Sequence, residues 1–409
     1  MPQNWKTYKL GDVAVLNKKN INPKNFNDEI YIGLEHIGKG SFLIESTGSA
    51  SDVTSNKAIF ASGDILYGKI RPYFKKVYRP KFSGICSTDI LVIGPRNESN
   101  VTQDYLYQLI RTQEFTDRAT ETSTGTKMPR ADWNSLTKLN YSFPPLSEQK
   151  AIVSILSALD DKIELNLQQN KTLEEMAMAL YKHWFVDFGP FQDGEFVDSE
   201  LGMIPKGWEV KSIGELIETL GGGTPKTKVI EYWQNGDIDW YSPTDLTSAN
   251  SLYSLGTAKK ITKLGLQKSS AKLFPKNSLL MSSRATIGAI TINRKEACTN
   301  QGFITMLPND KLSLYQLHGW TVFNMDVIIS KANGSTFKEI SKTNFRNLPI
   351  ALGIKIQDYL TEVSNYYSLI ESNILENQTL TQLRDTLLPK LISGEVRLKE
   401  FEKTAEAAL

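Results

Sequence analysis

Residues 163–173, IELNLQQNKTL, return as residues 370–380, IESNILENQTL. Six of these eleven positions are identical, in the pattern I-E-x-N-x-x-x-N-x-T-L, at an offset of 207 residues. Self-similarity at a fixed offset is the sequence signature of a repeated structural unit. The two stretches therefore predict that the chain, 409 residues long, holds two copies of one unit.

Weaker matches occur in the same order along both halves, at offsets of about 203–213 residues. They pair Trp5 with Trp208, Leu10 with Ile213, Arg71 with Arg284, Cys86 with Cys298, Gly125 with Gly334, Leu139 with Leu348 and Gln149 with Gln357. Each match is weak alone, but their common order supports a tandem repeat that spans nearly the whole chain.

Each copy ends in a stretch with an apolar residue at every third or fourth position. These residues are Ile152, Leu156, Leu159, Ile163, Leu167, Leu173, Ala177 and Leu180 in the first stretch and Ile356, Leu360, Val363, Tyr367, Ile370, Ile374, Leu380, Leu383 and Leu387 in the second. The spacing predicts two long helices, over 147–185 and 356–388, with coiled-coil-like seams. Pro389 and Gly394 are expected to end the second helix.

The first part of each copy is rich in β-branched and aromatic residues with frequent Gly, Pro, Asn and Ser breaks, which indicates a mixed structure of strands and short helices. Residues 83–95 are expected to form a strand that ends in a turn, and residues 289–292 a second strand. Residues 104–116 are expected to form a short helix. The fold class is therefore α+β: two mixed α/β domains in tandem, joined by two long helices.

The predicted domains follow the chain in order. They are a first mixed domain over 1–146, a central helical region over 147–187, a linker over 188–206, a second mixed domain over 207–353, a C-terminal helical region over 354–393 and a tail over 394–409. Two similar halves in one chain can pack about a pseudo-two-fold axis, as a symmetric dimer does. Such an axis would make the helices antiparallel, with Asn170 and Asn377 either fixing the register between them or facing solvent.

The composition limits the kind of function. The formal net charge is only +2, and the chain has two cysteines and three histidines, which show no metal-ligand spacing. The simplest interpretation of the two cysteines is that they are reduced thiols in a cytoplasmic protein. The N-terminus lacks the basic start and apolar core of a signal peptide, and no stretch is apolar enough to predict a membrane span.

Positive charge is concentrated in matching parts of the two copies. Residues 57–81 hold seven Lys and Arg residues against one acid, and residues 259–295 hold nine and no acid. A basic patch in each copy favours two surfaces that bind the phosphates of DNA, and the alternative is a solvated basic face.

Two polar, Gly-bent loops also correspond, at 123–130 and 332–338. Hydroxyl, amide and basic side chains on such loops can reach phosphates or base edges, although an ordinary polar turn would look similar. The candidate DNA-binding residues are Lys69, Arg71, Tyr73, Lys75, Lys127, Arg130, Ser283, Arg284, Asn333, Ser335, Thr336 and Lys338.

Sequence motifs of catalysis are missing. Residues 63–69 fit G-x-x-x-x-G-K, but Ile70 follows where a Ser or Thr would bind Mg²⁺. The chain has neither an Asn/Asp-Pro-Pro-Tyr/Phe box of amino-methyltransferases nor a Pro-Asp dipeptide of metal-dependent nucleases. Sequence order alone does not exclude a Ser-His-Asp arrangement, but nothing points to one. We therefore expect no active site and no metal or cofactor bound by this chain.

The chain resembles the specificity subunits of type I restriction–modification enzymes. Four features carry the resemblance: a Trp-x-x-x-x-Leu-Gly start at Trp5, FPPLSEQ at 143–149, DSELGMIPKGW at 198–208 and LISGE at 391–395. The resemblance implies two target-recognition domains that each read half of a split double-stranded DNA target. It also implies helical regions that bind two modification subunits, which carry S-adenosylmethionine, and restriction or translocase subunits that use ATP and Mg²⁺.

The resemblance assigns the helical residues to contacts with the modification subunits. The candidates are Gln149, Ile152, Leu159, Ile163, Asn170, Gln357, Ile370 and Asn377. The second copy departs from the PPLSEQ pattern, since Gly353-Ile354-Lys355-Ile356-Gln357 stands there, so identical docking of two modification subunits is in doubt. Two other interpretations stay open: a methyltransferase or nuclease with an unrecognised site, and a helical scaffold with no role on DNA.

Overall fold

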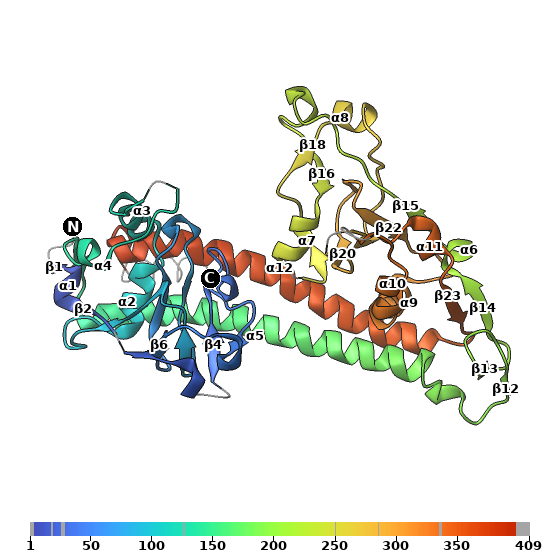
Figure 1. Ribbon diagram of the computed structural model, residues 1–409, viewed down its shortest axis with the longest axis horizontal. Coiled ribbons are helices and arrows are strands. Elements are labelled where there is room, and N and C mark those ends of the chain that lie inside the picture. The colour runs from blue at the N-terminus through green and yellow to red at the C-terminus, as the bar shows by residue number, and fades with distance from the viewer. Residues whose placement is uncertain are drawn as a thin grey trace. The chain divides into compact units, whose positions relative to one another are not determined.

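The computed structural model describes residues 4–17, 19–25, 29–125, 127–249, 251–284, 286–334 and 338–397. The chain forms two compact units: unit 1 is Met1–Glu164 with Asn377–Leu409, and unit 2 is Leu165–Glu376. The division crosses both long helices, α5 (Leu146–Phe185) and α12 (Gln357–Ser393), so each unit contains one end of each helix (Figure 1).

Unit 1 contains two sheets and a strand pair. A four-stranded sheet has the order β2 (Ala14–Leu16), β10 (Ile90–Pro95), β7 (Ile65–Gly68), β8 (Val77–Tyr78). A five-stranded sheet has the order β3 (Asn20–Ile21), β6 (Lys57–Phe60), β9 (Gly84–Cys86), β4 (Ile30–Ile32), β5 (Gly48–Ser49). The pair is β1 (Lys6–Lys9) with β11 (Asn140–Phe143), and the short helices are α1 (Leu10–Val13), α2 (Gln103–Ile110), α3 (Gln113–Glu121) and α4 (Trp133–Leu136).

Unit 2 repeats this plan. Its five-stranded sheet has the order β15 (Glu218–Leu220), β22 (Phe303–Leu307), β19 (Leu279–Ser282), β20 (Ile290–Asn293), β17 (Tyr253–Ser254), and its three-stranded sheet has the order β18 (Lys260–Ile261), β16 (Ile238–Tyr241), β21 (Ala297–Thr299). The strand pairs are β14 (Glu209–Ser212) with β23 (Pro349–Leu352) and β12 (Phe196–Val197) with β13 (Ile204–Pro205). The short helices are α6 (Ile213–Leu216), α7 (Pro243–Ala249), α8 (Lys263–Gln267), α9 (Leu314–Phe323), α10 (Met325–Ser330) and α11 (Lys342–Arg346).

The strand registers show how closely the two units agree. Leu66 of β7 pairs with Val92 of β10 in unit 1, and Leu280 of β19 pairs with Thr305 of β22 in unit 2. The parallel pairs also match, because Ile32 lies opposite Cys86 in unit 1 just as Trp240 lies opposite Cys298 in unit 2. The tandem α+β architecture predicted from the repeat is confirmed.

A glycine holds the same corner of each unit together. A Cβ atom on Gly11 would lie 2.9 Å from Cβ of Thr137, just after α4, and one on Gly214 would lie 2.9 Å from Cβ of Arg346 in α11. Real Cβ atoms do not approach this closely, so the Leu-Gly and Ile-Gly starts of the two units are packing requirements.

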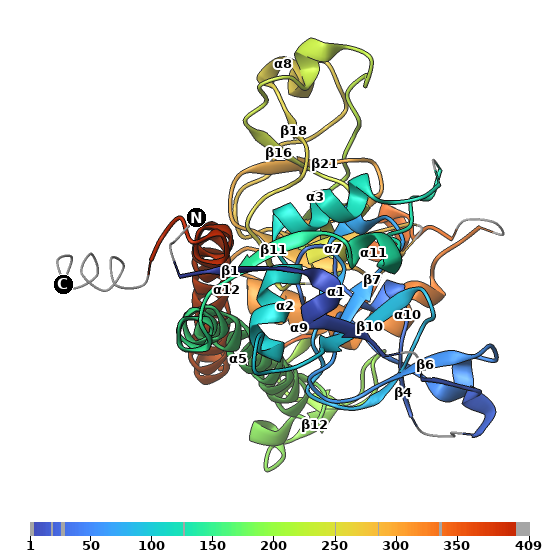
Figure 2. The same ribbon diagram turned by 90° about the vertical axis from the view of Figure 1, so that its left-hand side faces the viewer.

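The predicted helix over 104–116 is two helices, and this expectation was wrong. Tyr105, Leu106, Leu109 and Ile110 of α2 are buried as predicted and α2 lies against β10 (Figure 2). The helix then stops, because the hydroxyl of Thr112 accepts a hydrogen bond from the backbone N–H of Phe115 and begins α3. The predicted strand over 83–95 is likewise two strands, β9 and β10, which belong to different sheets and are separated by a turn at 87–89.

The ends of α5 and α12 pack antiparallel within each unit. In unit 1 the first turns of α5, with Ile152 and Leu156, share a core with Leu388 and Leu391 near the end of α12. In unit 2 the end of α5 meets the start of α12, where the rings of Phe185 and Tyr359 lie 4.8 Å apart. Most residues of the seams predicted from three-and-four spacing are therefore buried or partly buried, but Leu167 and Leu383 are exposed.

Helix α12 ends before Gly394, as expected, but it runs through Pro389, which was also expected to end it. It continues to Ser393, and Gly394 follows with a positive φ of 73°. Proline inside a helix costs about 3 kcal/mol. Leu391 and Ile392 beyond it are buried in the core of unit 1, and their burial offsets that cost. The predicted tail over 394–409 lies beyond the described residues from 398 onwards.

One part of unit 2 stands away from the rest of that unit. The sheet β18-β16-β21 and helix α8 pack on their own small core, in which Trp240, Ile261, Ala271 and Cys298 are buried. We call residues 223–241, 257–276 and 295–299 the extension. Figure 1 shows it reaching away from α9 and α10 of the same unit.

Candidate nucleic-acid interface

In unit 1 two loops meet beside the end of β7. The first, residues 69–76, connects β7 to β8, and the second, residues 124–130, is closed by two backbone hydrogen bonds between Thr124 and Arg130. Arg71 donates its backbone N–H to the carbonyl of Pro129 at 2.8 Å, and Ile70 forms an antiparallel bridge with Arg130. The sequence-predicted residues Lys69, Arg71, Lys127 and Arg130 are therefore brought together.

The first loop is conformationally strained and presents aromatic and basic groups. Arg71 and Lys75 both have left-handed backbones, with φ of 51° and 49°. Residues other than glycine rarely adopt this region, and such strain clusters at functional sites. The Arg71 guanidinium lies 5.9 Å from the ring of Phe74, and Tyr73 stands beside that ring with 49% of its surface exposed.

Several cations of the stretch 57–81 bind groups of unit 1 itself. Lys57 is buried and donates to Ser55, while Lys76 donates to two backbone carbonyls. Arg79 and Lys81 form ion pairs with Asp104 and with Asp161 and Glu164. The basic stretch is thus not one surface, and the DNA-facing candidates reduce to the two loops.

Lys75 points inward within unit 1. Its Nζ lies 5.7 Å from the ring of Phe42, and burial lowers the pKa of Lys75. Lys69 is half-exposed and its Nζ donates to the carbonyl of Thr88, with Asp89 at 3.4 Å. A phosphate contact by either lysine would have to compete with these internal contacts.

Unit 2 contains a corresponding pair of loops, in which three of the backbone hydrogen bonds of unit 1 recur. Asn333 and Glu339 exchange two backbone hydrogen bonds, as Thr124 and Arg130 do, and Arg284 forms an antiparallel bridge with Glu339. The N–H of Ile340 donates to the carbonyl of Ser283 at 3.0 Å, as Ala131 donates to Lys69 at 2.8 Å. We call each set, 69–76 with 124–130 and 283–289 with 333–339, a loop pair.

The bridges correct one equivalence drawn from the sequence. Ile70 and Arg284 occupy the same place, since each is bridged to the residue that closes the second loop. Arg71 therefore does not correspond to Arg284. Ser283 is a second correction, because it is 3% exposed and its backbone bonds Gly302 and Ile340, so its side chain is not presented to DNA.

The remaining predicted residues of the second loop pair belong to its second loop, 333–339. Asn333 and Lys338 are exposed on either side of the loop. Ser335 and Thr336 lie outside the described residues.

The helical residues proposed as docking contacts are mostly internal. Gln149 is fully buried: its amide donates to the carbonyls of Asn100 and Pro144, and its oxygen accepts from the N–H of Thr102. Ile152, Ile163 and Ile370 are also buried, Leu159 is partly buried, and Gln357 is exposed. Gln149 and the three isoleucines therefore stabilise the units and do not form a docking surface, which corrects that assignment.

The two asparagines form contacts between the helices. Asn170 is 7% exposed and accepts a hydrogen bond from the Asn373 amide at 2.9 Å within unit 2. Asn377 donates to the carbonyl of Ile163 at 3.3 Å within unit 1. Both side chains lie between the helices, the arrangement that allows a polar group to fix register.

A buried ion pair that the sequence did not suggest lies behind the first loop pair. The Arg111 guanidinium is fully buried and donates to both carboxylate oxygens of Asp160 in α5, at 2.5 and 2.9 Å. It also lies over the rings of Phe42 and Tyr107, at 4.3 and 4.9 Å. Arg384 of α12 contacts the same carboxylate at 3.2 Å. Nothing in a single sequence pairs residues 49 positions apart, so this site could not be anticipated.

Groups with catalytic or metal-binding potential are few in the described part of the chain. No group of three His, Cys, Asp or Glu side chains there could hold a metal ion. Cys86 and Cys298 are buried, which raises the pKa of each thiol to about 12 and leaves it protonated at neutral pH. No helix among these residues is both long and apolar enough to cross a bilayer.

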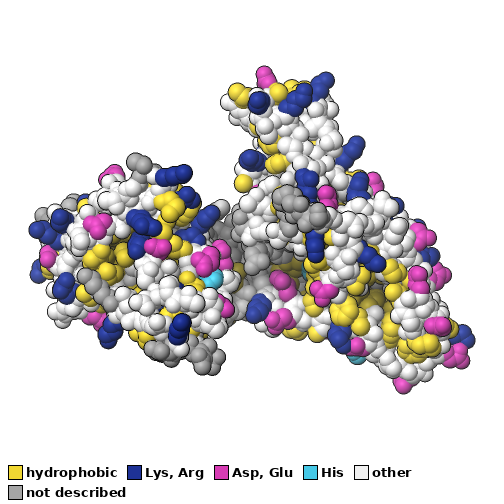
Figure 3. Space-filling view, in the orientation of Figure 1, with side chains coloured by type: hydrophobic (Ala, Val, Ile, Leu, Met, Phe, Trp, Pro, Cys, Tyr) yellow, Lys and Arg dark blue, Asp and Glu magenta, His cyan; other side chains and the backbone are white. Residues whose placement is uncertain are grey.

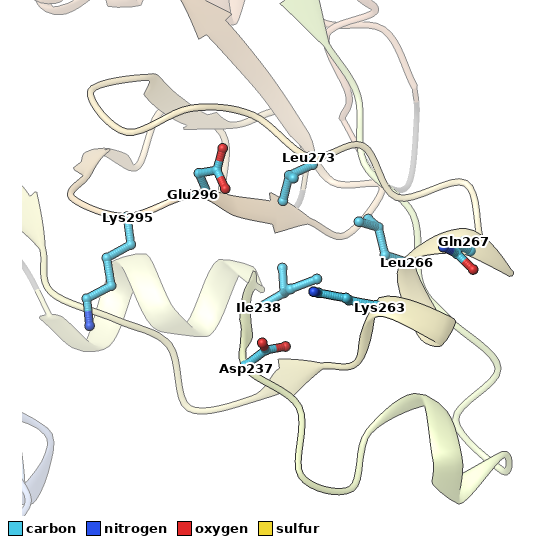
Figure 4. Close-up of a pocket in the computed structure, with 8 residues that line it drawn as sticks. All are labelled: Asp237, Ile238, Lys263, Leu266, Gln267, Leu273, Lys295 and Glu296. Atoms are coloured by element: carbon cyan, nitrogen blue, oxygen red, sulfur yellow. The ribbon is translucent and has the colours of Figure 1, made fainter.

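The extension contains a cavity of about 620 Å³. Figure 4 shows its lining, in which Lys263 and Lys295 stand with Asp237 and Glu296 around Ile238, Leu266 and Leu273. The two lysines and two acids balance in charge, so the cavity has no preference for an anion.

A family model for the type I restriction modification DNA specificity domain matches the chain twice, at residues 2–175 and 205–380. The chain belongs to this family. A specificity subunit is the non-catalytic component of a type I system that recognises DNA, and each matched region contains one loop pair.

Relatives and a solved structure agree with this assignment. The chain is 26% identical to the specificity subunit of the type I restriction enzyme HindI of Haemophilus influenzae, over 96% of this chain and all of that protein. It is 28% identical to the MjaIX specificity subunit of Methanocaldococcus jannaschii, over 74% and 71% of the two chains. The crystal structure of the S subunit from M. genitalium superposes with a TM-score of 0.54 at 16% identity, covering 95% and 96% of the chains, and shows the same fold.

Proposed function

We propose that this specificity subunit reads a bipartite DNA target, with one half-site contacted by each loop pair. The observation that carries the proposal is the duplicated loop pair, because one backbone frame occurs twice with different side chains on it. Two copies of one DNA-recognition element would contact two half-sites about a helical turn apart, with bases between them that are not recognised.

Within each loop pair, arginine would supply the base contacts. A guanidinium can donate two parallel hydrogen bonds to one guanine, and one such contact discriminates by about 1–3 kcal/mol. Arg71 and Arg130 are the candidates in unit 1, and Arg284 is the candidate in unit 2. Exposed lysines such as Lys127 and Lys338 would bind phosphates and contribute affinity without sequence preference.

The helices would bind two modification subunits through residues other than the buried seam. In unit 2 several leucine and methionine side chains on α5 and α12 remain exposed: Leu165, Leu167, Met176, Leu369 and Leu375. One of them, Leu369, lines a groove of about 390 Å³ together with polar residues that include Gln168 and Thr172. Apolar surface of this kind is typical of protein contacts. We place S-adenosylmethionine, ATP and Mg²⁺ on the modification and restriction subunits, and the complex in the cytoplasm.

The test is to map methylated sites in DNA exposed to the complex assembled with its modification subunits. We expect two short specified elements with a spacer of constant length. Arg71→Lys and Arg284→Lys should each relax one element only, because lysine keeps the charge but loses the guanidinium fork. Lys206→Gln, an exposed change outside the loop pairs and the long helices, should leave both elements unchanged.

Other outcomes would reject the proposal. A single continuous target, or relaxation of the same element by both variants, would contradict one half-site per loop pair. Methyl transfer or cleavage by the partner-free chain would favour an enzyme with an unrecognised site. Absence of salt-dependent DNA binding would favour a scaffold for other macromolecules.

A further inference from the structure

The extension of unit 2 differs in charge from its counterpart in unit 1. Residues 223–241, 257–276 and 295–299 contain nine lysines and four acids, a formal net charge of +5. All nine lysines are exposed: Lys226, Lys228, Lys259, Lys260, Lys263, Lys268, Lys272, Lys276 and Lys295. Figure 3 shows basic side chains along this part of the unit.

Unit 1 contains the same substructure without this charge. Its strands β5, β4 and β9 pair as β18, β16 and β21 do, with an antiparallel and a parallel neighbour of the central strand. The matching stretch 19–61 has four lysines and five acids. One of those lysines, Lys57, is buried. Because one scaffold folds with both compositions, folding does not require the nine lysines.

Most of the lysines make no ion pair within the described residues. The exception is Lys260, whose Nζ lies 3.4 Å from the buried carboxylate of Asp239. Exposed like charges repel one another, and keeping them unpaired on a small sheet costs stability unless a ligand of opposite charge binds there. These lysines belong to a protein that acts on DNA. Duplex DNA carries one phosphate charge per about 1.7 Å of its axis.

We propose that the extension of unit 2 is a second DNA-binding surface, which contacts phosphates without reading sequence and has no counterpart in unit 1. The inference rests on the proposed function of the loop pairs and adds an asymmetry to it. All nine cations are lysines, which bind phosphate as point charges and lack the fork that reads guanine. Unit 2 would therefore supply more of the sequence-independent affinity than unit 1.

The test compares two triple variants of the complex assembled with its modification subunits. Lys263→Gln/Lys268→Gln/Lys272→Gln removes three charges from the extension. Lys19→Gln/Lys24→Gln/Lys206→Gln removes three exposed charges elsewhere and serves as the control. Dissociation constants for target and non-target duplexes are measured between 50 and 200 mM salt.

Each lost phosphate contact lowers the slope of log K against log salt by about 0.9, so three contacts lower it by about 2.7. When the salt rises from 50 to 200 mM, the affinity of the unaltered complex for DNA should fall about 40-fold further than the affinity of the extension variant. The change should be equal for target and non-target DNA, and the map of methylated sites should stay the same.

Three results would overturn the proposal. The slope could stay unchanged, or the control could lower it equally, which would indicate a general effect of net charge. Alternatively the extension variant could fail to assemble with a partner subunit at an unchanged slope, which would make the extension a protein-binding surface. If instead the unaltered complex showed no bipartite target, the proposed function would fail independently of the extension.

Discussion

Replacing Asp160 with alanine is expected to destabilise unit 1 by about 3 kcal/mol, the lower end of the cost of breaking a buried ion pair. The cost arises at Arg111, which is 0% exposed and would keep its charge without the carboxylate that binds it. The cost stays at the lower end because the Asp160 side chain is 27% exposed, so water can partly replace the carboxylate beside Arg111. Asp160→Asn should cost less, since the amide oxygen still accepts one hydrogen bond.

Two companion variants separate this charge effect from simple loss of a side chain. Asp161→Ala removes the neighbouring carboxylate, which is 67% exposed and lies 3.6 Å from an exposed lysine, and should change stability by less than about 0.5 kcal/mol. Arg111→Met combined with Asp160→Ala removes the buried charge as well. This double variant should be more stable than Asp160→Ala alone, because the buried Arg111 charge is gone and Arg384 keeps Asp385 as a partner at 2.9 Å.

The measurement is hydrogen exchange of the assembled protein, resolved by peptide. Two units can unfold separately, so a single global transition would not locate the change. A loss of 3 kcal/mol corresponds to exchange faster by about 10²-fold, and we expect it in peptides over 103–121 while α9 in unit 2 stays protected. Equal effects of Asp160→Ala and Asp161→Ala would refute the argument.

Two further predictions concern a buried histidine of unit 2 and a packing glycine of unit 1. The His318 imidazole is buried, its Nδ1 lies 2.5 Å from the hydroxyl of Tyr367, and burial lowers the pKa of His318 to about 4. Below about pH 6.5 the unfolded chain binds a proton at His318 that the folded chain does not bind. The free energy of unfolding of unit 2 should therefore fall by up to about 3 kcal/mol as the pH falls from 6.5 to 4. His318→Gln should abolish that part of the pH dependence of unfolding, and an unchanged profile would show that another group is responsible. Gly11→Ala should lower the free energy of unfolding, measured with denaturant, by about 1–3 kcal/mol, because the new Cβ would meet Thr137. Gly94→Ala is the control and should cost less than about 1 kcal/mol, because the nearest atom to its Cβ lies 3.6 Å away. Similar costs at both sites would contradict the packing argument.

The sequence predicted the repeat and the long helices because both are periodic signals. Ile163 and Ile370 sit in identical local patterns, and their burial follows from three-and-four spacing. The same periodicity misjudged which residues face a partner. A seam residue looks the same whether it is covered by the other helix of its own chain or by another protein.

Local composition alone misplaced two element boundaries. Thr112 interrupts a helix whose apolar pattern continues past it, because its hydroxyl caps the next helix. Pro389 lies inside a helix because the residues after it are buried in unit 1. At Pro389 tertiary contacts outweigh the local signal, whereas at Thr112 a local capping hydrogen bond outweighs the apolar periodicity.

The candidate site was predicted in part because its glycines are visible in the sequence. Gly125 and Gly334 have φ of 92° and 118°, and a turn with positive φ marks each second loop. The side chains around them could not be aligned from sequence, since the bridges that equate Ile70 with Arg284 are contacts between distant segments. Ser283 was misassigned for the same reason: a hydroxyl next to an arginine suggests a binding loop, whereas backbone bonds to Gly302 and Ile340 bury it.

The corrected equivalence bears on how one frame can read two different half-sites. If Arg71 and Arg284 occupied the same place, the two units would present one guanidinium to DNA in the same position, and their half-sites would be expected to share a base. The structure instead places an isoleucine in unit 1 where unit 2 has the arginine, and closes the second loop with Arg130 in unit 1 and Glu339 in unit 2. Three backbone hydrogen bonds of the loops recur in both units, and they fix the position of the loops without fixing their side chains. Different side chains on a common frame predict two unlike half-sites, and a target that is a palindrome would contradict this reasoning.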